Sequence, residues 1–159
     1  MKTFLKVLFL VLLSCTKVPQ PGAGQQQEAP QEESQMSDKI QITVDGKTLP
    51  IALENNAATK ALVEALRAAS ITYTARDYGG FEKVGALGRS LPANDSQITT
   101  QAGDVILYSG NQLVLFYGSN SWSYTRIGKM EYGSMDALKS FLKAGEGDIR
   151  VTLSLEPES

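Results

Sequence analysis

Short segments in which apolar and polar residues alternate recur from Ile40 to Leu155, and this period of two predicts a fold built mainly from β-strands. The first alternating segment, Ile40–Val44, is followed directly by Asp45-Gly46, a strong signal for a two-residue hairpin turn. Strands are expected at 40–44, 49–53, 70–77, 98–101, 105–108, 113–117, 123–130 and 149–155.

Two of these segments, Val105–Tyr108 and Leu113–Tyr117, are apolar without interruption. A continuous apolar run of this length indicates a strand that is covered on both faces, and Gly110-Asn111 between the two runs is expected to form a hairpin turn. The stretch 78–97 is rich in Gly, Pro and Asn and is expected to be mostly loop.

Two short helices are expected, at 57–69 and at about 135–144, because apolar residues there recur at helical spacing. Asn55 or Asn56 can cap the first helix, and Ser134 the second. Together these elements predict a mostly β fold, a closed or nearly closed β-barrel of about eight strands capped by two short α-helices. The residues expected in its core include Leu62, Leu66, Leu115, Phe141 and Val151.

The N-terminus carries an export signal. Two lysines precede a run of apolar residues, Val7–Leu13, which is too short to cross a bilayer as a helix and is typical of a signal peptide. The sequence Leu12-Leu13-Ser14-Cys15 resembles the bacterial lipobox, which implies cleavage before Cys15 and acylation of that residue. The alternative is an uncleaved apolar N-terminus with an incidental cysteine.

The expected domains are therefore a signal peptide at 1–14, a lipidated Cys15 with a disordered polar tether at 15–38, and a folded domain at 39–159. The lipid would anchor the chain in the membrane of a bacterial cell envelope. By the lipoprotein sorting rule, Thr16 in place of aspartate implies the outer membrane facing the periplasm, if the cell has two membranes.

Composition excludes several classes of function. The formal net charge is −2 and no basic block is present, so nucleic acid is not an expected partner. The chain has no histidine and one cysteine, which removes the commonest general base and the usual metal ligands. No metal, no cofactor and no catalytic residue is expected.

Several stretches resemble a family of small bacterial cyclophilin-like domains. The resemblance covers Lys39–Leu155 and implies a cyclophilin-type barrel. The matching stretches are Ile42–Lys47 (ITVDGK), Tyr78–Lys83 (YGGFEK), Leu91-Pro92, Ala102–Tyr108 (AGDVILY), and Leu113–Tyr117 (LVLFY) leading to Ser123–Arg126 (SYTR).

True cyclophilins are prolyl isomerases, but their catalytic pattern is not reproduced here. Arg76 lies in the corresponding region, yet residues 77–80 differ from the pattern around it and no histidine exists. Gln101-Ala-Gly-Asp104 looks like the Gln-x-Gly-Asp string of that site, but it opens a strand and comes too late in the chain. A binding module for a small ligand, a peptide or an envelope protein is therefore expected, and a divergent prolyl isomerase is the alternative.

The candidate ligand site is a barrel mouth at which two loops meet. Tyr78 and Glu82 follow the strand that ends at Asp77, and the other candidates lie at the start of a later strand, sharing one face of it. Aromatic rings with a few polar groups are typical of small-ligand sites. The alternative is that Trp122 and Tyr124 are core residues at the rim, and that Arg126 pairs with Glu82 or Asp77. The five candidates are Tyr78, Glu82, Trp122, Tyr124 and Arg126.

Overall fold

The structure is a computed structural model that describes residues 39–157. The signal peptide at 1–14, Cys15 and the tether up to residue 38 lie outside the described residues. The elements are β1 (Ile40–Val44), β2 (Lys47–Leu53), α1 (Ala57–Ala68), β3 (Ile71–Tyr78), β4 (Glu82–Ala86), β5 (Ser96–Thr99), β6 (Asp104–Tyr108), β7 (Gln112–Phe116), β8 (Ser121–Met130), α2 (Met135–Phe141) and β9 (Ile149–Leu155).

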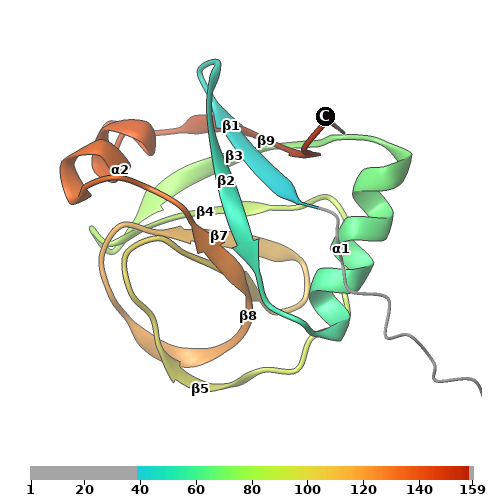
Figure 1. Cartoon of the computed structure of the whole chain (residues 1–159). Coiled ribbons are helices and arrows are strands. Elements are labelled where there is room, and N and C mark those ends of the chain that lie inside the picture. The colour runs from blue at the N-terminus through green and yellow to red at the C-terminus, as the bar shows by residue number, and fades with distance from the viewer. Residues whose placement is uncertain (1–38, 158–159) are drawn as a thin grey trace, which may run out of the picture. The chain divides into compact units, whose positions relative to one another are not determined.

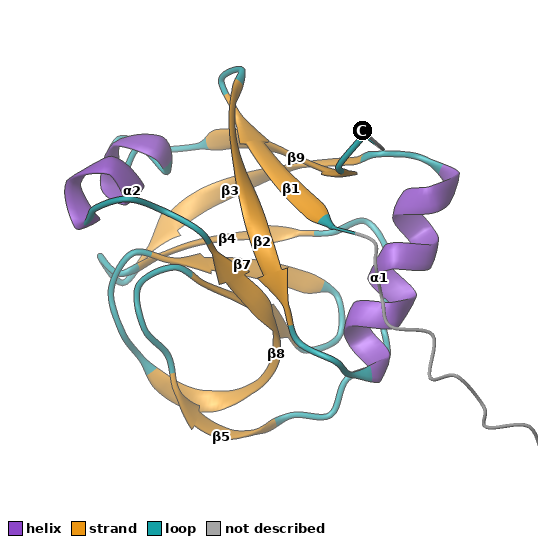
Figure 2. Cartoon of the chain, in the orientation of Figure 1, coloured by secondary structure: helices purple, strands orange, loops and turns teal. Residues whose placement is uncertain are grey.

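Eight strands form a closed antiparallel barrel, as expected from the sequence. They follow the order β2-β1-β9-β3-β4-β7-β6-β8, and the ring closes because β8 also pairs with β2. Strand β5 lies outside the ring and pairs with the first half of β8, which curves away from the barrel to meet it (Figure 2). The mostly β fold with two short helices is confirmed.

Strands β6 and β7 are buried on both faces, as their uninterrupted apolar sequences predict. The inward side chains, such as Val105 and Leu115, belong to the main core inside the barrel. The outward side chains, such as Ile106 and Val114, belong to a second apolar cluster on the outer surface of the same strands. The fold therefore has two hydrophobic clusters, separated by one layer of sheet.

The helices lie on opposite sides of the barrel (Figure 1). Asn56 caps α1 by accepting a hydrogen bond from the amide of Thr59 at 2.9 Å, and Ser134 caps α2 in the same way. Helix α2 ends at Phe141, earlier than expected, because Lys143 adopts a left-handed φ of 47° that a helix cannot continue. The residues expected in the core are all buried: Leu62, Leu66, Leu115, Phe141 and Val151.

Two local details differ from the expectation. The stretch 78–97 is mostly loop, as expected, but it also contains strand β4, which lacks a strand-like sequence pattern because its inward residues are Lys83 and Gly85. The turn between β6 and β7 is centred on Ser109 and Gly110, both with positive φ, one residue before the expected position. Within residues 39–157, no helix is long and apolar enough to cross a membrane.

Candidate functional site

The second apolar cluster carries the candidate site. It covers the outward face of four neighbouring barrel strands, β4, β7, β6 and β8, and it includes Tyr124 of β8. A strand alternates between faces, so Glu82 and Val84 of β4 point outward while Lys83 points into the barrel. The site therefore lies on the wall of the barrel.

Glu82 lies between two aromatic residues in one row across three strands. Tyr78 of β3 is its direct partner on one side, and Phe116 of β7 is its direct partner on the other. Side chains directly opposite each other in antiparallel strands lie on the same face and within contact distance. The sheet therefore places a carboxyl group between two rings.

A glycine turn brings a third ring to this carboxyl group. Gly79 and Gly80 connect β3 to β4 with φ values of 62° and 76°, which residues with side chains rarely adopt. A Cβ atom on Gly79 would lie 2.2 Å from the ring of Phe81, and one on Gly118 would lie 2.7 Å from the Cβ atom of Phe81. Both glycines thus leave the space that Phe81 occupies.

The aromatic rings form a continuous chain that begins beside Glu82 and continues across the outer wall of the barrel. Phe81 meets Tyr78 edge-on with 6.5 Å between ring centroids, and it stacks on Phe116 at 6.2 Å. Tyr124 packs edge-on against Phe116 and Tyr108, at 5.9 Å in each case. These are favourable geometries for aromatic pairs. We call this group the Glu82 cluster, and its members are Glu82, Tyr78, Phe81, Tyr108, Phe116 and Tyr124.

One oxygen of the Glu82 carboxyl group is buried without a hydrogen-bond partner. The residue exposes 6% of its surface, and its Oε2 atom is buried with no hydrogen-bond partner. Burial favours the neutral form of a carboxyl group, and here it raises the pKa of Glu82 to about 7. Glu82 therefore changes charge near neutral pH, which is unusual for a glutamate and typical of functional sites.

Neighbouring groups do not neutralise Glu82. Lys83 follows it in the chain but lies inside the barrel, where its Nζ atom is 2.8 Å from Oδ2 of Asp77. Burial and the hydrogen bond to the Asp77 carboxylate raise the pKa of Tyr117 to about 12, with a smaller contribution from Glu82. Burial also raises the pKa of Tyr124, although its hydrogen bond with Asn120 acts in the opposite direction. These two tyrosines are therefore uncharged near neutral pH.

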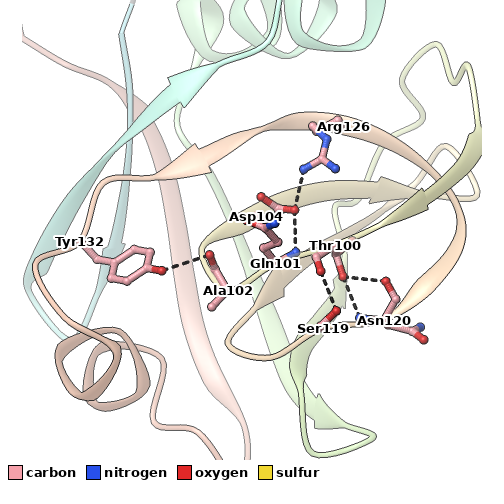
Figure 3. Close-up of polar contacts among 8 residues, drawn as sticks. All are labelled: Thr100, Gln101, Ala102, Asp104, Ser119, Asn120, Arg126 and Tyr132. Atoms are coloured by element: carbon pink, nitrogen blue, oxygen red, sulfur yellow. Dashed lines mark hydrogen bonds and ion pairs between the residues drawn. The ribbon is translucent and has the colours of Figure 1, made fainter.

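Arg126 lies on the same outward face but has a different partner from the expected ones. A bulge in the β6–β8 pairing places it opposite Ile106, and its Nη1 atom is 2.5 Å from Oδ2 of Asp104 (Figure 3). The same oxygen accepts a hydrogen bond from the amide of Gln101. The alternative in which Arg126 pairs with Glu82 or Asp77 is therefore wrong.

The structure brings three of the five candidates together. Tyr78, Glu82 and Tyr124 belong to the Glu82 cluster, on the outer wall of the barrel where a mouth was expected. Trp122 lies two residues before Tyr124, opposite Ile98 of β5, and is 55% exposed. Among the described residues, the ring contacts of the cluster do not include Trp122.

Sequence reasoning did not place Phe81, Tyr108 and Phe116 in the site. The signal was present in the apolar run Leu113–Tyr117, because a strand buried on both faces needs a covering layer outside the barrel. Which aromatic residues supply that layer depends on strand pairing, which the sequence does not reveal.

Two surface hollows lie away from the Glu82 cluster. One of about 400 Å³ is lined by residues of β2 and the end of β8, and one of about 410 Å³ lies between β2 and α2; Tyr132 lines both. None of the five candidate residues lines either hollow. Within residues 39–157, no group of three acidic, Cys or His side chains is arranged to hold a metal ion.

Comparison with known proteins identifies the family to which this fold belongs. Residues 42–154 match the model of the cyclophilin-like family, and this match covers most of the chain. The chain belongs to the cyclophilin-like family. A hypothetical protein of Archaeoglobus fulgidus, known from a solution structure, shares the fold of this cyclophilin-like chain with a TM-score of 0.51 at 17% identity. The similarity covers 74% of this chain and 93% of the archaeal one. No curated protein matches the sequence.

Proposed function

We propose that this cyclophilin-like protein is a lipid-anchored binding module, and that its ligand binds at the Glu82 cluster. One observation carries the proposal: the buried Oε2 atom of Glu82 has no hydrogen-bond partner. Leaving a buried polar group unpaired costs about 1–3 kcal/mol, and more if the group is charged. A ligand that donates a hydrogen bond to this oxygen recovers that free energy when it binds.

The surroundings of Glu82 favour binding over a purely structural role. A structural carboxyl group is normally paired, as Asp77 and Asp104 are in this protein. Glu82 instead lies among aromatic rings, and Tyr78 at the edge of the cluster is 63% exposed. Aromatic side chains with a few polar groups among them are typical of the lining of small-ligand sites.

A ligand screen by thermal shift tests this proposal. A ligand that binds only the native protein raises its melting temperature by mass action. We expect the stabilising compounds to lose their effect in Glu82→Gln and to keep it in Glu131→Gln, a matched change at an exposed glutamate after β8. Equal stabilisation of the wild type and Glu82→Gln would show that the compounds bind at a different site.

The membrane anchor is the second part of the proposal and rests on the lipobox-like sequence Leu12–Cys15. Several acyl chains on one residue give stable membrane attachment. We expect Cys15→Ser to remove the lipid and to move the protein into the soluble fraction, in the envelope of a bacterium that processes lipoproteins. Unchanged membrane partitioning with an intact N-terminus in the mass spectrum would reject the anchor.

A divergent prolyl isomerase is the second candidate function. The observation that favours it is the position of Arg126, a partly exposed arginine opposite apolar Ile106 on the outer wall. Uncatalysed prolyl isomerisation takes tens to hundreds of seconds, so catalysis is easily measured. Rate enhancement that Arg126→Ala abolishes would replace the binding proposal with an enzymatic one.

A further inference from the structure

We infer that the ligand of the Glu82 cluster carries a protonated primary amine, whose N–H groups donate to Oε2 of Glu82 while its alkyl chain lies against the rings of Tyr78 and Phe81. This inference rests on the proposed function and specifies the chemistry of the ligand.

The charge of the ligand follows from what surrounds the carboxylate. Within residues 39–157, no lysine or arginine forms an ion pair with Glu82. Lys83 faces the barrel interior and is engaged by Asp77, and Arg126 is engaged by Asp104. A cation brought by a ligand is therefore the missing partner of this carboxylate, because a buried charge is stable only when it is paired.

The aromatic rings select the same class of ligand. The faces of aromatic rings carry negative potential and attract cations within about 6 Å of the ring centroid. Tyr78 and Phe116 lie in register on either side of Glu82, and Phe81 contacts both rings. An anion at this place would be repelled by the carboxylate and would gain nothing from the rings.

The unpaired oxygen distinguishes between kinds of cation. Oε2 of Glu82 is an acceptor that lacks a donor, and an ammonium group carries N–H donors that a quaternary ammonium group does not. Charge-assisted hydrogen bonds of this kind are about twice as strong as neutral ones. A primary amine therefore satisfies both the charge and the acceptor.

Access to Glu82 runs past Tyr78. Phe81 and Phe116 are stacked on each other, and Phe116 is fully buried, so neither ring leaves easily. Tyr78 is 63% exposed and is the last residue of β3, just before the glycine turn. Because Oε2 of Glu82 is buried, binding as inferred requires a side chain beside it to move, and Tyr78 is the most exposed of the three neighbouring rings.

Binding should depend on pH because an ammonium ion prefers the carboxylate form of Glu82. The pKa of Glu82 is about 7, so the affinity should fall up to about tenfold per pH unit below that value. The other titratable groups of the cluster are the hydroxyls of Tyr78 on β3, Tyr108 on β6 and Tyr124 on β8, joined by Tyr117 after β7. Arg76 on β3 lies on the same outward face, opposite Val84, and is exposed to solvent. Lys83 forms an ion pair with Asp77, and Arg126 forms one with Asp104.

Three probes of equal chain length test the inference on the whole protein. These are n-butylammonium, which has charge and donors, butyltrimethylammonium, which has charge alone, and 1-butanol, which has a donor alone. Binding is followed by NMR shifts of the backbone amides and aromatic rings of residues 78–82 and 116. We expect n-butylammonium to bind at pH 8 at least tenfold more tightly than either other probe.

Matched variants locate the effect. Glu82→Gln keeps the size of the side chain and should lower the affinity for n-butylammonium at least tenfold, whereas Glu131→Gln should not change it. Tyr78→Leu should lower the affinity for n-butylammonium severalfold, because the aromatic ring beside Glu82 is lost. The spectrum of each variant at pH 8 also shows whether it is folded, so lost binding is separated from unfolding.

The outcomes separate this inference from the proposed function. If 1-butanol or butyltrimethylammonium binds at these residues as tightly as n-butylammonium, the cluster is a binding site and the amine inference is wrong. If none of the three probes shifts these residues, the amine inference is wrong, and the ligand screen alone decides the proposed function. If Nα-acetyl-lysine methylamide binds more tightly than n-butylammonium, the amine belongs to a lysine side chain; if it binds less tightly, the amine is a small free ligand.

Discussion

The Nζ atom of Lys83 lies 2.8 Å from Oδ2 of Asp77, and this ion pair joins β3 to β4 inside one end of the barrel. The Lys83 side chain is fully buried, and its ammonium group also donates to the carbonyl of Gly147. Asp77 accepts three further hydrogen bonds, from the amides of Gly145 and Gly147 and from the hydroxyl of Tyr117. A charged network therefore holds the loop after α2 against the barrel.

Removing the charge of Asp77 should destabilise the protein strongly. Asp77→Asn keeps the shape of the side chain but leaves the buried ammonium group of Lys83 without its counterion. Breaking a buried pair in this way costs about 3–5 kcal/mol. The free energy of unfolding in urea measures the loss, and Glu64→Gln in the exposed Glu64–Arg67 pair is the control, with an expected loss below about 1 kcal/mol. A loss below about 1 kcal/mol for Asp77→Asn would contradict this account of the pair.

Asp77 should also contribute to acid unfolding. Despite burial, hydrogen bonds from Lys83, the two glycine amides and Tyr117 lower its pKa from 3.8 to about 2. A carboxyl group whose pKa is lower in the folded state stabilises the protein above pH 4, and this contribution disappears as the pH falls from about 4 to about 2. The shift corresponds to about 2 kcal/mol. Urea titrations between pH 2 and pH 5 should show a steeper loss for the wild type than for Asp77→Asn, and parallel slopes would disprove the assignment.

Glu82 should have the opposite effect on stability. Its pKa is raised from 4.5 to about 7 in the folded protein, so the folded state binds the proton more tightly than the unfolded state. Stability should therefore fall as the pH rises from about 4.5 to about 7, by about 3 kcal/mol at most. Glu82→Gln, which is never charged, should be more stable than the wild type at pH 8 and similar to it at pH 4. Equal stability at pH 8 would show that the carboxylate is solvated or paired.

Two tyrosines inside the barrel should respond differently to loss of the hydroxyl group. The hydroxyl of Tyr73 is buried with no hydrogen-bond partner, whereas that of Tyr117 donates to Asp77 at 3.0 Å. We expect Tyr73→Phe to leave stability unchanged or to raise it, because an unsatisfied polar group is removed. Tyr117→Phe should lower stability by about 1–3 kcal/mol, since hydrogen bonds to charged groups are the stronger ones. Thermal unfolding of the two variants side by side checks this order.

The helices should stabilise the barrel through their buried faces. Leu66 of α1 and Phe141 of α2 expose 5% and 7% of their surfaces and belong to the main core. Leu66→Ala and Phe141→Ala should each cost about 2–5 kcal/mol, because each leaves a cavity. Ala68 at the exposed end of α1 offers a control, since Ala68→Ser should change stability by less than about 1 kcal/mol. Small losses in both core variants would mean that the helices contribute little packing energy.

The barrel was predictable because its strands carry strong local signals. Ile40–Val44 and Ile149–Leu155 alternate clearly, and Asp45-Gly46 forms the expected turn with both residues at positive φ. The missed strand β4 lacks such a signal, since neither of its inward residues is a large apolar one. These residues are Gly85 and Lys83, and Lys83 is paired with Asp77 on the neighbouring strand. Gly85 has no space for a side chain, because a Cβ atom there would lie 2.1 Å from the carbonyl oxygen of Thr74.

The candidate site was predictable only in part, because it depends on pairing between distant segments. Tyr78 and Glu82 were recognised from one loop, and Tyr124 from another. Phe116 completes the row only through the register of β4 with β7. Likewise, the partner of Arg126 depends on a register shift in the pairing of β6 with β8, which no local sequence pattern indicates.

The pairing of β1 with β9 brings the first and last strands of the domain together. Ile40 lies opposite Leu155, so the chain enters and leaves the barrel at neighbouring points (Figure 1). Strand β3 starts level with this region, where Ile71 faces Leu153, and runs away from it for about 23 Å to Tyr78. Glu82 lies directly opposite Tyr78, so its carboxyl group is separated by about the length of one strand from the point where the described chain enters the barrel.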